Sequence, residues 1–409
     1  MHIEPSDESG ADAARHSAAI RFPIPRTVPL DPPAELTELR SRCPVAPVLL
    51  HDGTPAWLVT RYDDVRTVLG DDRFSSVGSW RFQPSASRAA AEKGEKSFTA
   101  MDPPEHTFFR KLLTRHFTVK RIGELGPAVA EIVDDAITEM LGMPQPVDLV
   151  KALAFPIASR TMCHFIGVPY EDHEWYEERA NIRSVMGADP VEVAQATDDL
   201  LDYVDRLVDV KLATPANDLM TRLAQELLVP DIVSRADLVA ILRLLLTAGH
   251  ETTATMIGTG TFVLLQHPDQ LAQMLANREL VPDVVEELLR YVSMLHSTIV
   301  RVAKEEVELS GTCVHAGDGL IATPGAANKD PEVFPEPHRF DIHRDARHHI
   351  AFGYGVHQCL GQPVARLELR TVFNTLFDRI PGLRLAVPAE EVPFNDSNLI
   401  GVSSLPVTW

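Results

Sequence analysis

The chain has 409 residues, of which 45% are hydrophobic and 23% are charged, a composition that is ordinary for a globular protein. A chain of this length buries roughly three quarters of its unfolded surface, so it can enclose a large dry interior. The 38 basic and 58 acidic residues give a net charge of −20, which disfavours binding to nucleic acid and to anionic membranes. An anionic ligand must therefore meet a local basic cluster.

The first part of the chain, residues 1–35, is polar and rich in proline, which predicts a mobile start followed by an extended arm. Because neither a signal-peptide core nor a run of about 18 apolar residues occurs, we expect no membrane span. Four cysteines lie far apart without Cys-x-x-Cys spacing, so neither a disulfide framework nor a structural zinc site is expected. This cysteine usage is typical of a cytoplasmic protein.

A hairpin and a short helix are the first predicted elements. Apolar runs at Val45–Leu50 and Ala56–Thr60 flank a turn sequence, His51-Asp52-Gly53-Thr54. A helix should follow near Tyr62 to Leu69. Residues 75–99 are rich in Ser, Arg and Lys without periodicity, which predicts a long loop.

The rest of the chain is predicted to be mainly helical. The helical pattern runs from 102 to about 293 and is interrupted by prolines. An alternating segment after Arg301 predicts a strand, residues 324–350 look irregular, and one more helix should follow Cys359 before a strand-like tail. The sequence therefore predicts one mainly α (α+β) domain over residues 1–409.

The segment Phe352–Gly361, FGYGVHQCLG, is the most informative part of the chain. Gly353 and Gly355 allow a tight turn and a close approach of the backbone to a flat ligand. Cys359 precedes a helix expected to begin near Pro363, and the electropositive N-terminus of that helix should lower the pKa of the thiol. A lone cysteine in such a turn is usually a structural residue, but the whole Phe-Gly-x-Gly-x-x-x-Cys-x-Gly pattern predicts a thiolate ligand for iron.

A second motif, Thr247–Thr253 (TAGHETT), lies in an apolar segment that predicts one long helix over about 236–266. The small side chain of Ala248 leaves room for a ligand on one face. The Thr252 hydroxyl can donate to the carbonyl of Ala248 and bend the helix. Since Glu251 lies beside this hydroxyl, the motif suits proton delivery, although plain helix packing is an alternative.

Two further groups of charged residues suggest clusters. Glu287 and Arg290 are three apart on a predicted helix and can pair, and Arg339 could complete the cluster, although such pairs are common on surfaces. In Asp102-Pro103-Pro104-Glu105, Asp102 is predicted to cap a helix. His106 and Arg110 share a face of that helix and can donate to a carboxylate, although two solvated side chains would give the same pattern.

Together these motifs, spread in this order from residue 102 to 369, resemble the cytochrome P450 family. The cysteine loop is similar to the haem-binding loop of that family, and TAGHETT is similar to its oxygen-activating helix. The resemblance implies a triangular, helix-rich prism with a small β region. It also implies a monooxygenase that inserts one oxygen atom of O2 into a hydrophobic small molecule, such as a secondary metabolite or a xenobiotic, by hydroxylation or epoxidation.

The resemblance assigns roles to individual residues. Cys359 would bind the iron of haem b, Glu251 and Thr252 would deliver protons, and Glu287, Arg290 and Arg339 would form a structural triad. The residues that it places against the haem are His106, Arg110, Ala248, Arg301, Phe352, Gly353, His357 and Gly361. Those that it places near the substrate, in addition to Ala248, are Leu244, Ser297, Thr298, Ile299 and Ile400, with the loop at 75–99 and the helix pair around Ile182–Met186.

The family resemblance also predicts partners. No reductase domain is attached, so electrons from NAD(P)H should arrive through a separate ferredoxin and ferredoxin reductase, and we expect a monomer. The basic residues predicted for this docking face are Lys111, Arg115, Arg344, Arg347, Arg366 and Arg370. Two alternatives stay open: a peroxide-driven peroxygenase or oxidative coupling enzyme on the same fold, and a haem-binding sensor or partner protein without enzymatic activity.

Overall fold

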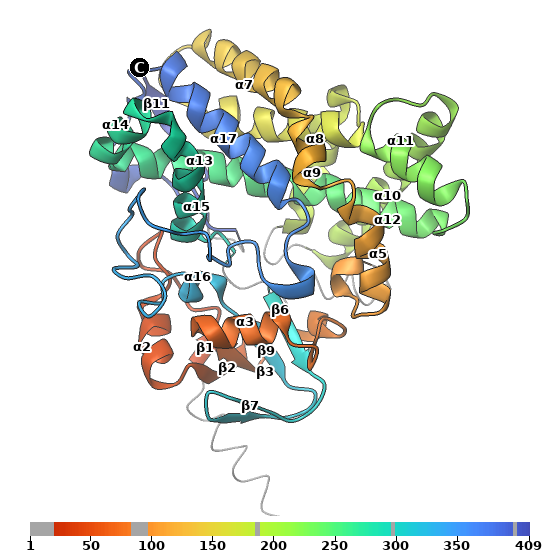
Figure 1. The fold of residues 1–409 in the computed structure, drawn as a ribbon, viewed down its shortest axis with the longest axis vertical. Coiled ribbons are helices and arrows are strands. Elements are labelled where there is room, and N and C mark those ends of the chain that lie inside the picture. The colour runs from red at the N-terminus through yellow and green to blue at the C-terminus, as the bar shows by residue number, and fades with distance from the viewer. Residues whose placement is uncertain (1–19, 83–96, 185–188, 296–298, 396–398) are drawn as a thin grey trace, which may run out of the picture.

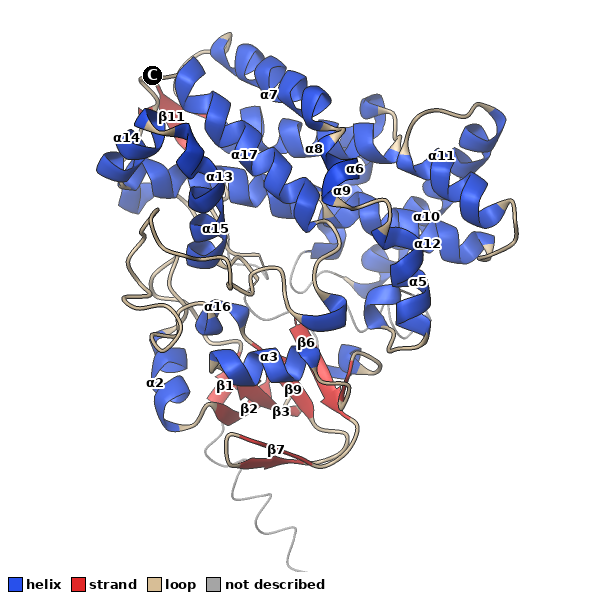
Figure 2. Cartoon of the chain, viewed as in Figure 1, coloured by secondary structure: helices blue, strands red, loops and turns tan. Residues whose placement is uncertain are grey.

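The computed structural model describes residues 20–82, 97–184, 189–295, 299–395 and 399–409. In the view of Figure 1 the main sheet and the helices packed against it form the lower part of the molecule, and a larger helical part lies above it. Figure 2 shows the same division by secondary structure. The chain after α16 runs between the two parts and leads into α17, so the segment that contains Cys359 lies where they meet.

The lower part is built on a six-stranded sheet with the strand order β1-β2-β3-β9-β6-β4. The pairs β1–β2 and β3–β9 are parallel, and the other three pairs are antiparallel. The strands are β1 Ile20–Phe22, β2 Val45–Leu50, β3 Pro55–Val59, β4 Phe74–Ser75, β6 Ile299–Ala303 and β9 Gly319–Ala322.

The predicted hairpin is confirmed by the antiparallel pairing of β2 and β3. Its turn is stabilised by the backbone N–H of Thr54, which donates to the Asp52 carboxylate at 2.9 Å, and Gly53 adopts a φ of +83°. The sheet is accompanied by α2 (Ala34–Arg42), α3 (Tyr62–Gly70) and the short α16 (Pro324–Ala327). Of the predicted N-terminal arm, residues 20–22 are extended in β1, which pairs with β2, whereas residues 27–31 form bends and a turn before α2 begins.

The helical part packs two apolar cores. One core joins α7, α8, α13, α15 and α17, and the other joins α5, α8, α10 and α12. The helices of this part are α5 Glu105–Thr114, α6 Val119–Gly123, α7 Gly126–Leu141, α8 Phe155–Ile166, α9 His173–Ser184, α10 Pro190–Ala213, α11 Leu219–Leu223, α12 Arg235–Ala248, α13 His250–Gln266, α14 Pro268–Ala276, α15 Val281–Val292 and α17 Gln362–Arg379.

Helix α13 is buried on every side from Thr253 to Leu264, which explains why its sequence is apolar all round. The single helix predicted over about 236–266 is in fact two, α12 and α13, with a break at Gly249. The remaining strands form two small sheets. They are β5 Val147–Asp148, β10 Arg384–Leu385 and β11 Pro406–Thr408 in one, and β7 Val307–Leu309 and β8 Thr312–Val314 in the other.

Two expectations concern the membrane and the cysteines. Within the described residues, no helix combines the length and the apolar character needed to cross a membrane. All four cysteines lie within the described residues, and none of them forms a disulfide. Most of the predicted loop at 75–99 lies outside the described residues. The parts on either side contain β4 and two short 3-10 turns, Ser79–Phe82 and Phe98–Ala100.

Candidate functional site

The loop at 352–361 closes immediately before α17. The backbone N–H of Cys359 donates to the carbonyl of Phe352 at 2.8 Å. The N–H groups of Gly361 and Gln362 donate toward the Cys359 sulfur, and the Cys359 side chain stays accessible to a ligand. Desolvation nevertheless raises the pKa of this thiol and outweighs the backbone donors, so the expected lowering is wrong. A metal cation at the sulfur would reverse this balance, since a coordinating thiol is deprotonated.

Two glycines set the shape of this loop. Gly353 and Gly355 both have a φ of +73°, which is the left-handed region that glycine adopts without strain. A Cβ at Gly355 would lie 2.6 Å from the carbonyl oxygen of Leu69 and 2.8 Å from Cα of Gly70. No side chain fits there, so the end of α3 packs directly on the backbone of the cysteine loop.

Four basic side chains meet beside the loop. His106 and Arg110 lie on α5, Arg301 lies in β6, and His357 precedes Cys359 in the loop. The imidazole rings of His106 and His357 have their centroids 4.0 Å apart. The positive charges of Arg110 and Arg301 both act on these imidazoles, and Arg110 also interacts with Cys359. Residues that lie far apart in the sequence thus form one basic cluster.

Among the described residues, Asp102 is the one carboxylate that acts on this basic cluster. Burial and the neighbouring positive charges lower the pKa of His357 to about 3 and lower the pKa of His106, and burial lowers the pKa of Arg301 to about 10. Both ring nitrogens of His106 are buried without a hydrogen-bond partner among the described residues. A ligand with two carboxylates beside Cys359 would supply these partners, so the donor set fits the propionates of a haem.

Asp102 is the acidic residue near this cluster, and it is already engaged. Its carboxylate accepts hydrogen bonds from the Ser75 hydroxyl and from the backbone N–H of Ser76, the latter at 2.8 Å. The prediction that Asp102 caps the following helix is therefore wrong, because α5 begins at Glu105 and this carboxylate is turned to β4. Ser76 in turn contacts Nε2 of His357 at 3.0 Å. The sequence does not mark these serines as part of the site, because they lie in the segment predicted to be a long loop.

The second motif surrounds the break between α12 and α13. The Thr252 hydroxyl donates to the carbonyl of Ala248 at 2.9 Å, as predicted. Gly249 allows a close approach of α8, since a Cβ at this position would lie 2.6 Å from the sulfur of Met162 and would force that side chain to move. The Glu251 side chain is partly exposed beside this bend. Ala248, Glu251 and Thr252 therefore combine a bent backbone, a carboxylate and a hydroxyl in one turn.

His250, in the same motif, packs against a neighbouring helix. Its imidazole is buried, with Nε2 lying 3.0 Å from a carboxylate oxygen of Glu177 on α9. Phe155 and Tyr176 contact the same ring, at centroid distances of 5.2 and 6.2 Å. His250 thus ties the start of α13 to α9. The sequence carries no local sign of this contact, because the two residues are far apart in the chain.

The predicted charged cluster on α15 exists, with one wrong member. Glu287 and Arg290 are fully buried and form two hydrogen bonds, at 2.6 and 2.8 Å. Arg339 does not join them, because its side chain is 63% exposed and pairs with Glu336. Arg344 takes this place, with Nε lying 3.3 Å from Glu287 and only 10% of the side chain exposed. Arg339 contributes its backbone carbonyl instead, to both Arg290 and Arg344.

A neighbouring ion-pair network braces the cysteine loop. Glu286 on α15 accepts two hydrogen bonds from Arg366 on α17, at 2.7 and 2.8 Å, and contacts His349 at 3.2 Å. Burial opposes ionisation, but these partners outweigh it and lower the pKa of Glu286 to about 2. The Arg366 guanidinium also lies over the ring of Phe352, 4.7 Å from its centroid. This network holds the start of α17 against the loop.

The carboxyl group of Glu368, on α17, is completely buried. Thr161 on α8 and Thr253 on α13 are its polar neighbours and act to lower its pKa. Desolvation is the larger effect and raises the pKa of Glu368 well above its ordinary value. Burial among these helices therefore favours the protonated form of this side chain. Sequence analysis did not single it out, since Glu368 reads there as an ordinary polar residue of a helix.

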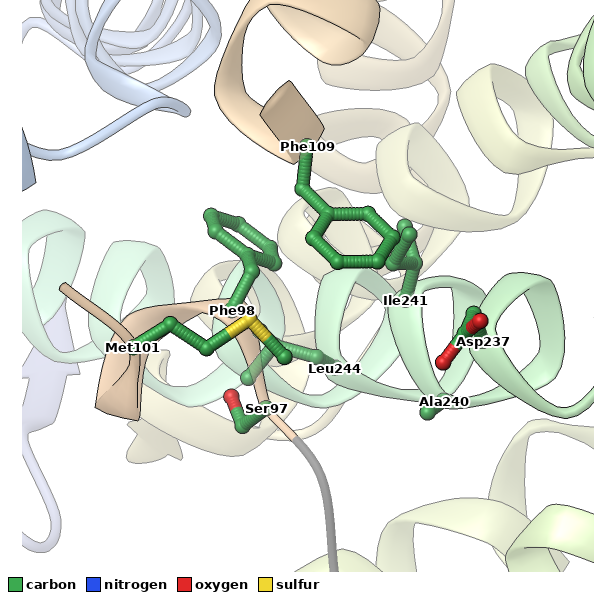
Figure 3. A pocket seen from close by; sticks show the side chains of 8 residues that line it. All are labelled: Ser97, Phe98, Met101, Phe109, Asp237, Ala240, Ile241 and Leu244. Carbon is green, nitrogen blue, oxygen red and sulfur yellow. The ribbon is translucent and has the colours of Figure 1, made fainter. Parts of the chain in front are cut away.

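The residues predicted to contact substrate are only partly brought together. Leu244 on α12 lines a pocket with Phe98, Met101 and Phe109, and Figure 3 shows these side chains gathered on one side of α12. Ile299 opens β6, and Ile400 is buried near the C-terminus. Ser297, Thr298 and Met186 lie outside the described residues. The full list of residues that line this pocket is Ser97, Phe98, Met101, Phe109, Asp237, Ala240, Ile241 and Leu244.

Comparison with known proteins agrees with this geometry. The family model described as "Cytochrome P450" matches residues 173–403. Pentalenic acid synthase of Streptomyces avermitilis is 43% identical and covers 96% of this chain and 98% of its own length. Vitamin D3 dihydroxylase of Streptomyces griseolus is 42% identical, with coverages of 95% and 96%.

Solved structures confirm the expected fold. The mycinamicin VIII C21 methyl hydroxylase MycCI of Micromonospora griseorubida, bound to mycinamicin VIII, superposes with a TM-score of 0.90 at 38% identity. The match covers 95% of this chain and 100% of that one. The helix-rich architecture with a small β region is therefore confirmed. The chain belongs to the cytochrome P450 family and is a monooxygenase of that family, in which a cysteine thiolate holds the haem iron.

Proposed function

We propose that this enzyme hydroxylates or epoxidises a hydrophobic, lightly oxygenated small molecule of secondary metabolism. The observation that carries this proposal is the position of Cys359. Its sulfur lies at the start of α17, where it interacts electrostatically with Arg110 of the basic cluster. The chain thus offers a cysteine sulfur and donors for two carboxylates at one place, as a haem requires.

The residues that would hold the haem come from three elements and the cysteine loop. Cys359 would bind the iron, and His106, Arg110, Arg301 and His357 would donate to the propionates. Phe352, Gly353 and Gly361 would give the loop a shape that admits a flat ring. The small side chain of Ala248 would leave space for the haem beside the bend. When bound, the haem supplies the iron at which dioxygen is reduced and from which one oxygen atom passes to the substrate.

Protons for this reaction would pass through the turn between α12 and α13. The Thr252 hydroxyl is held by the Ala248 carbonyl at 2.9 Å, which fixes the direction of its lone pairs. The Glu251 carboxylate is partly exposed and can exchange protons with solvent. We therefore assign proton supply to Glu251 and proton positioning to Thr252.

The substrate class is inferred from the pocket and from relatives. Phe98, Met101, Phe109 and Leu244 are apolar, which suits a hydrophobic ligand. Among the similar proteins, MycCI is described as a C21 methyl hydroxylase bound to mycinamicin VIII, and a Streptomyces fradiae relative as 20-oxo-5-O-mycaminosyltylactone 23-monooxygenase. Both descriptions name oxidation at a specific position of the substrate, and we propose the same type of reaction here.

Electrons would come from NAD(P)H through a ferredoxin and its reductase, with the enzyme acting as a cytoplasmic monomer. The structure narrows the predicted docking residues. Arg344 and Arg366 are used internally, against Glu287 and Glu286. Lys111, Arg115 and Arg347 are exposed, and Arg370 is partly exposed. The three arginines also pair with Glu226, Asp283 and Glu286, respectively. We propose that these four basic residues carry the docking of an acidic ferredoxin, with Lys111 as the main contact.

The proposal is tested first at the sulfur. Reduced enzyme exposed to carbon monoxide should show the red-shifted Soret band of thiolate ligation, and Cys359→Ser should abolish it. Cys43→Ser, a change of the same size away from the loop, should retain it. A band that survives Cys359→Ser would contradict the assignment of the axial ligand.

The type of reaction is tested with substrate candidates. A screen of natural-product libraries for shifts of the haem spin state should identify ligands, which are then incubated with ferredoxin, reductase and NAD(P)H under 18O2. Incorporation of one labelled oxygen atom supports the monooxygenase reaction. Product formed only with hydrogen peroxide would support the peroxygenase alternative instead.

A further inference from the structure

A second group of metal-ligating side chains lies on the β7–β8 hairpin, far from the cysteine loop. Glu306 precedes β7, Cys313 lies in β8, and His315 follows β8. Figure 1 shows this hairpin at the end of the molecule away from α17. Nothing in the monooxygenase reaction requires a cysteine or a histidine there.

The register of the hairpin forces these side chains onto one face. Val307 pairs with Val314, and Glu308 pairs with Cys313. Val307 and Val314 are buried in the apolar core beneath the hairpin, together with Leu309. Because side chains alternate along a strand, their neighbours in the sequence must point to solvent. The outward face therefore carries two carboxylates, a thiol and an imidazole, namely Glu306, Glu308, Cys313 and His315.

The spacing of the ligand atoms already approaches that of a metal site. Nδ1 of His315 lies 3.9 Å from the Cys313 sulfur and 3.3 Å from a carboxylate oxygen of Glu306. One ligand atom from each of the three residues lies within 4.8 Å of the other two. Tetrahedral zinc with ordinary bond lengths needs about 3.5 Å between sulfur and nitrogen and about 3.3 Å between nitrogen and oxygen. These two pairs need shifts of only a few tenths of an ångström. The sulfur and the carboxylate oxygen, which lie within 4.8 Å of each other, would have to close to about 3.6 Å through side-chain rotation.

The backbone around these ligands is held in place. The Asp318 carboxylate accepts hydrogen bonds from the backbone N–H of His315 at 2.9 Å and from the indole of Trp57 on β3 at 2.8 Å. Asp318 thus fixes the end of the hairpin that presents the imidazole against the main sheet. A site whose ligands come from a fixed scaffold loses less entropy when the ion binds.

We propose that Glu306, Cys313 and His315 bind one Zn2+ ion, with water as the fourth ligand. The alternative is that His315 and Glu306 form only an exposed ion pair, which would contribute little to stability. The thiol argues for the metal, since a soft sulfur ligand beside an imidazole selects zinc over the hard cations. The spacing of cysteines along the sequence does not reveal this site, because its ligands come from both strands of a hairpin.

The test uses the full-length haem enzyme and zinc alone. Isothermal titration with Zn2+ at neutral pH should give one site per chain, and zinc K-edge absorption should show a single sulfur neighbour near 2.3 Å. Cys313→Ser and His315→Ala should each weaken binding by at least about tenfold, since even outer partners of a metal have effects of that size. Cys43→Ser and His51→Ala serve as matched controls and should bind zinc as the parent does.

The carbon monoxide spectrum of each variant reports whether the enzyme is folded. Because Cys313 and His315 are exposed, both variants should retain that spectrum. Loss of zinc affinity in a variant with an intact spectrum supports the proposal. An absorption spectrum without sulfur scattering, or zinc binding unchanged in Cys313→Ser, overturns it.

Discussion

Thr252 shows how one hydroxyl can be held for chemistry and for shape at the same time. Its hydrogen bond to the Ala248 carbonyl uses the proton of the hydroxyl, so its lone pairs face the space beside the bend. The bend itself does not depend on Thr252 alone. Gly249 and its close contact with Met162 also hold the two helices at this point. A change at Thr252 should therefore affect proton supply more than folding.

We expect Thr252→Ala to keep consuming oxygen and NAD(P)H while forming less product. Without the positioned hydroxyl, protons arrive out of order and reduced oxygen leaves as hydrogen peroxide or water. Removal of a proton-transfer group costs roughly 10²-fold or more, which sets the scale for the loss of product per NAD(P)H. Thr252→Ser, which retains the hydroxyl, should remain coupled. Equal coupling in Thr252→Ala and the parent would refute the role.

Arg344 and Arg339 form a natural pair for mutation because only one of them is buried against Glu287. Arg344→Ala removes a partner from a fully buried carboxylate and should cost about 1–3 kcal/mol in the free energy of unfolding. Arg339→Ala removes an exposed ion pair and should change it by about 0.5 kcal/mol or less. Chemical denaturation of both variants, followed by the Soret band, measures the difference. Equal losses of unfolding free energy in the two variants would indicate that Arg339 also stabilises the buried Glu287.

At the scale of elements, α17 is involved with two buried carboxyl groups whose pKa values are shifted in opposite directions. It carries Glu368 itself, and it carries Arg366, the partner of Glu286. Arg366 stabilises the ionised form of Glu286 on α15, whereas burial between α8 and α13 favours the protonated form of Glu368. The helix that follows Cys359 thus contacts one carboxyl group whose pKa is lowered and carries another whose pKa is raised. Each carboxyl group therefore predicts how the free energy of unfolding changes in a different pH range, acidic for Glu286 and nearer neutral for Glu368.

On the acid side, the pKa of Glu286 in the folded enzyme is about 2, below its unfolded value. Its contribution is complete above the unfolded value and is lost as the pH falls toward 2. The full loss amounts to roughly 3 kcal/mol. Glu286→Gln should therefore be less stable than the parent at pH 6, and the two should converge at low pH. Parallel unfolding profiles between pH 6 and pH 3 would speak against this linkage.

On the neutral side, Glu368 has the reverse sign. Its folded pKa lies above the unfolded value, so the folded state keeps a proton that the unfolded state releases. Stability should fall as the pH rises from the unfolded value toward the folded one, by about 1.4 kcal/mol per pH unit for one group. Glu368→Gln removes this slope while preserving size and polarity. The measurement is urea unfolding from pH 5 to pH 8, and an unchanged slope would show that Glu368 ionises in the folded enzyme.

At the scale of the molecule, the net charge of −20 makes the position of exposed positive charges important. We expect ferredoxin-driven turnover to fall steeply as salt is raised, because surface charges are screened over about 10 Å at 0.1 M. Lys111→Ala should lower the rate severalfold at low salt only. Arg42→Ala removes an equally exposed charge from α2 and should leave the rate unchanged. Rates that do not depend on salt would exclude electrostatic docking.

The sequence predicted those parts of the site whose geometry is local. The glycines of the cysteine loop, the hydrogen bond from Thr252 to Ala248 and the Glu287–Arg290 pair each depend on residues within a few positions. Arg344 was missed in favour of Arg339 because the choice depends on how an irregular segment folds over α15. The single-domain organisation, the site roles and the redox partners stay predictions.

The missed contacts share the same cause. Ser76 meets His357, and Glu177 meets His250, only because separate elements pack together. The pKa of Cys359 was predicted in the wrong direction for a related reason. A helix N-terminus can be read from the sequence, whereas the protein atoms that desolvate the sulfur come from the tertiary fold.

The contact between α3 and the cysteine loop has a consequence for maturation of the enzyme. Gly355 lies against Leu69, and beside it Arg66 donates to the Tyr354 hydroxyl at 2.7 Å, across 288 positions of the chain. The cysteine loop therefore reaches its final conformation by packing on α3, a segment that the ribosome synthesises much earlier. Insertion of the prosthetic group cannot be a local event around Cys359, since it must wait until early and late parts of the polypeptide have met.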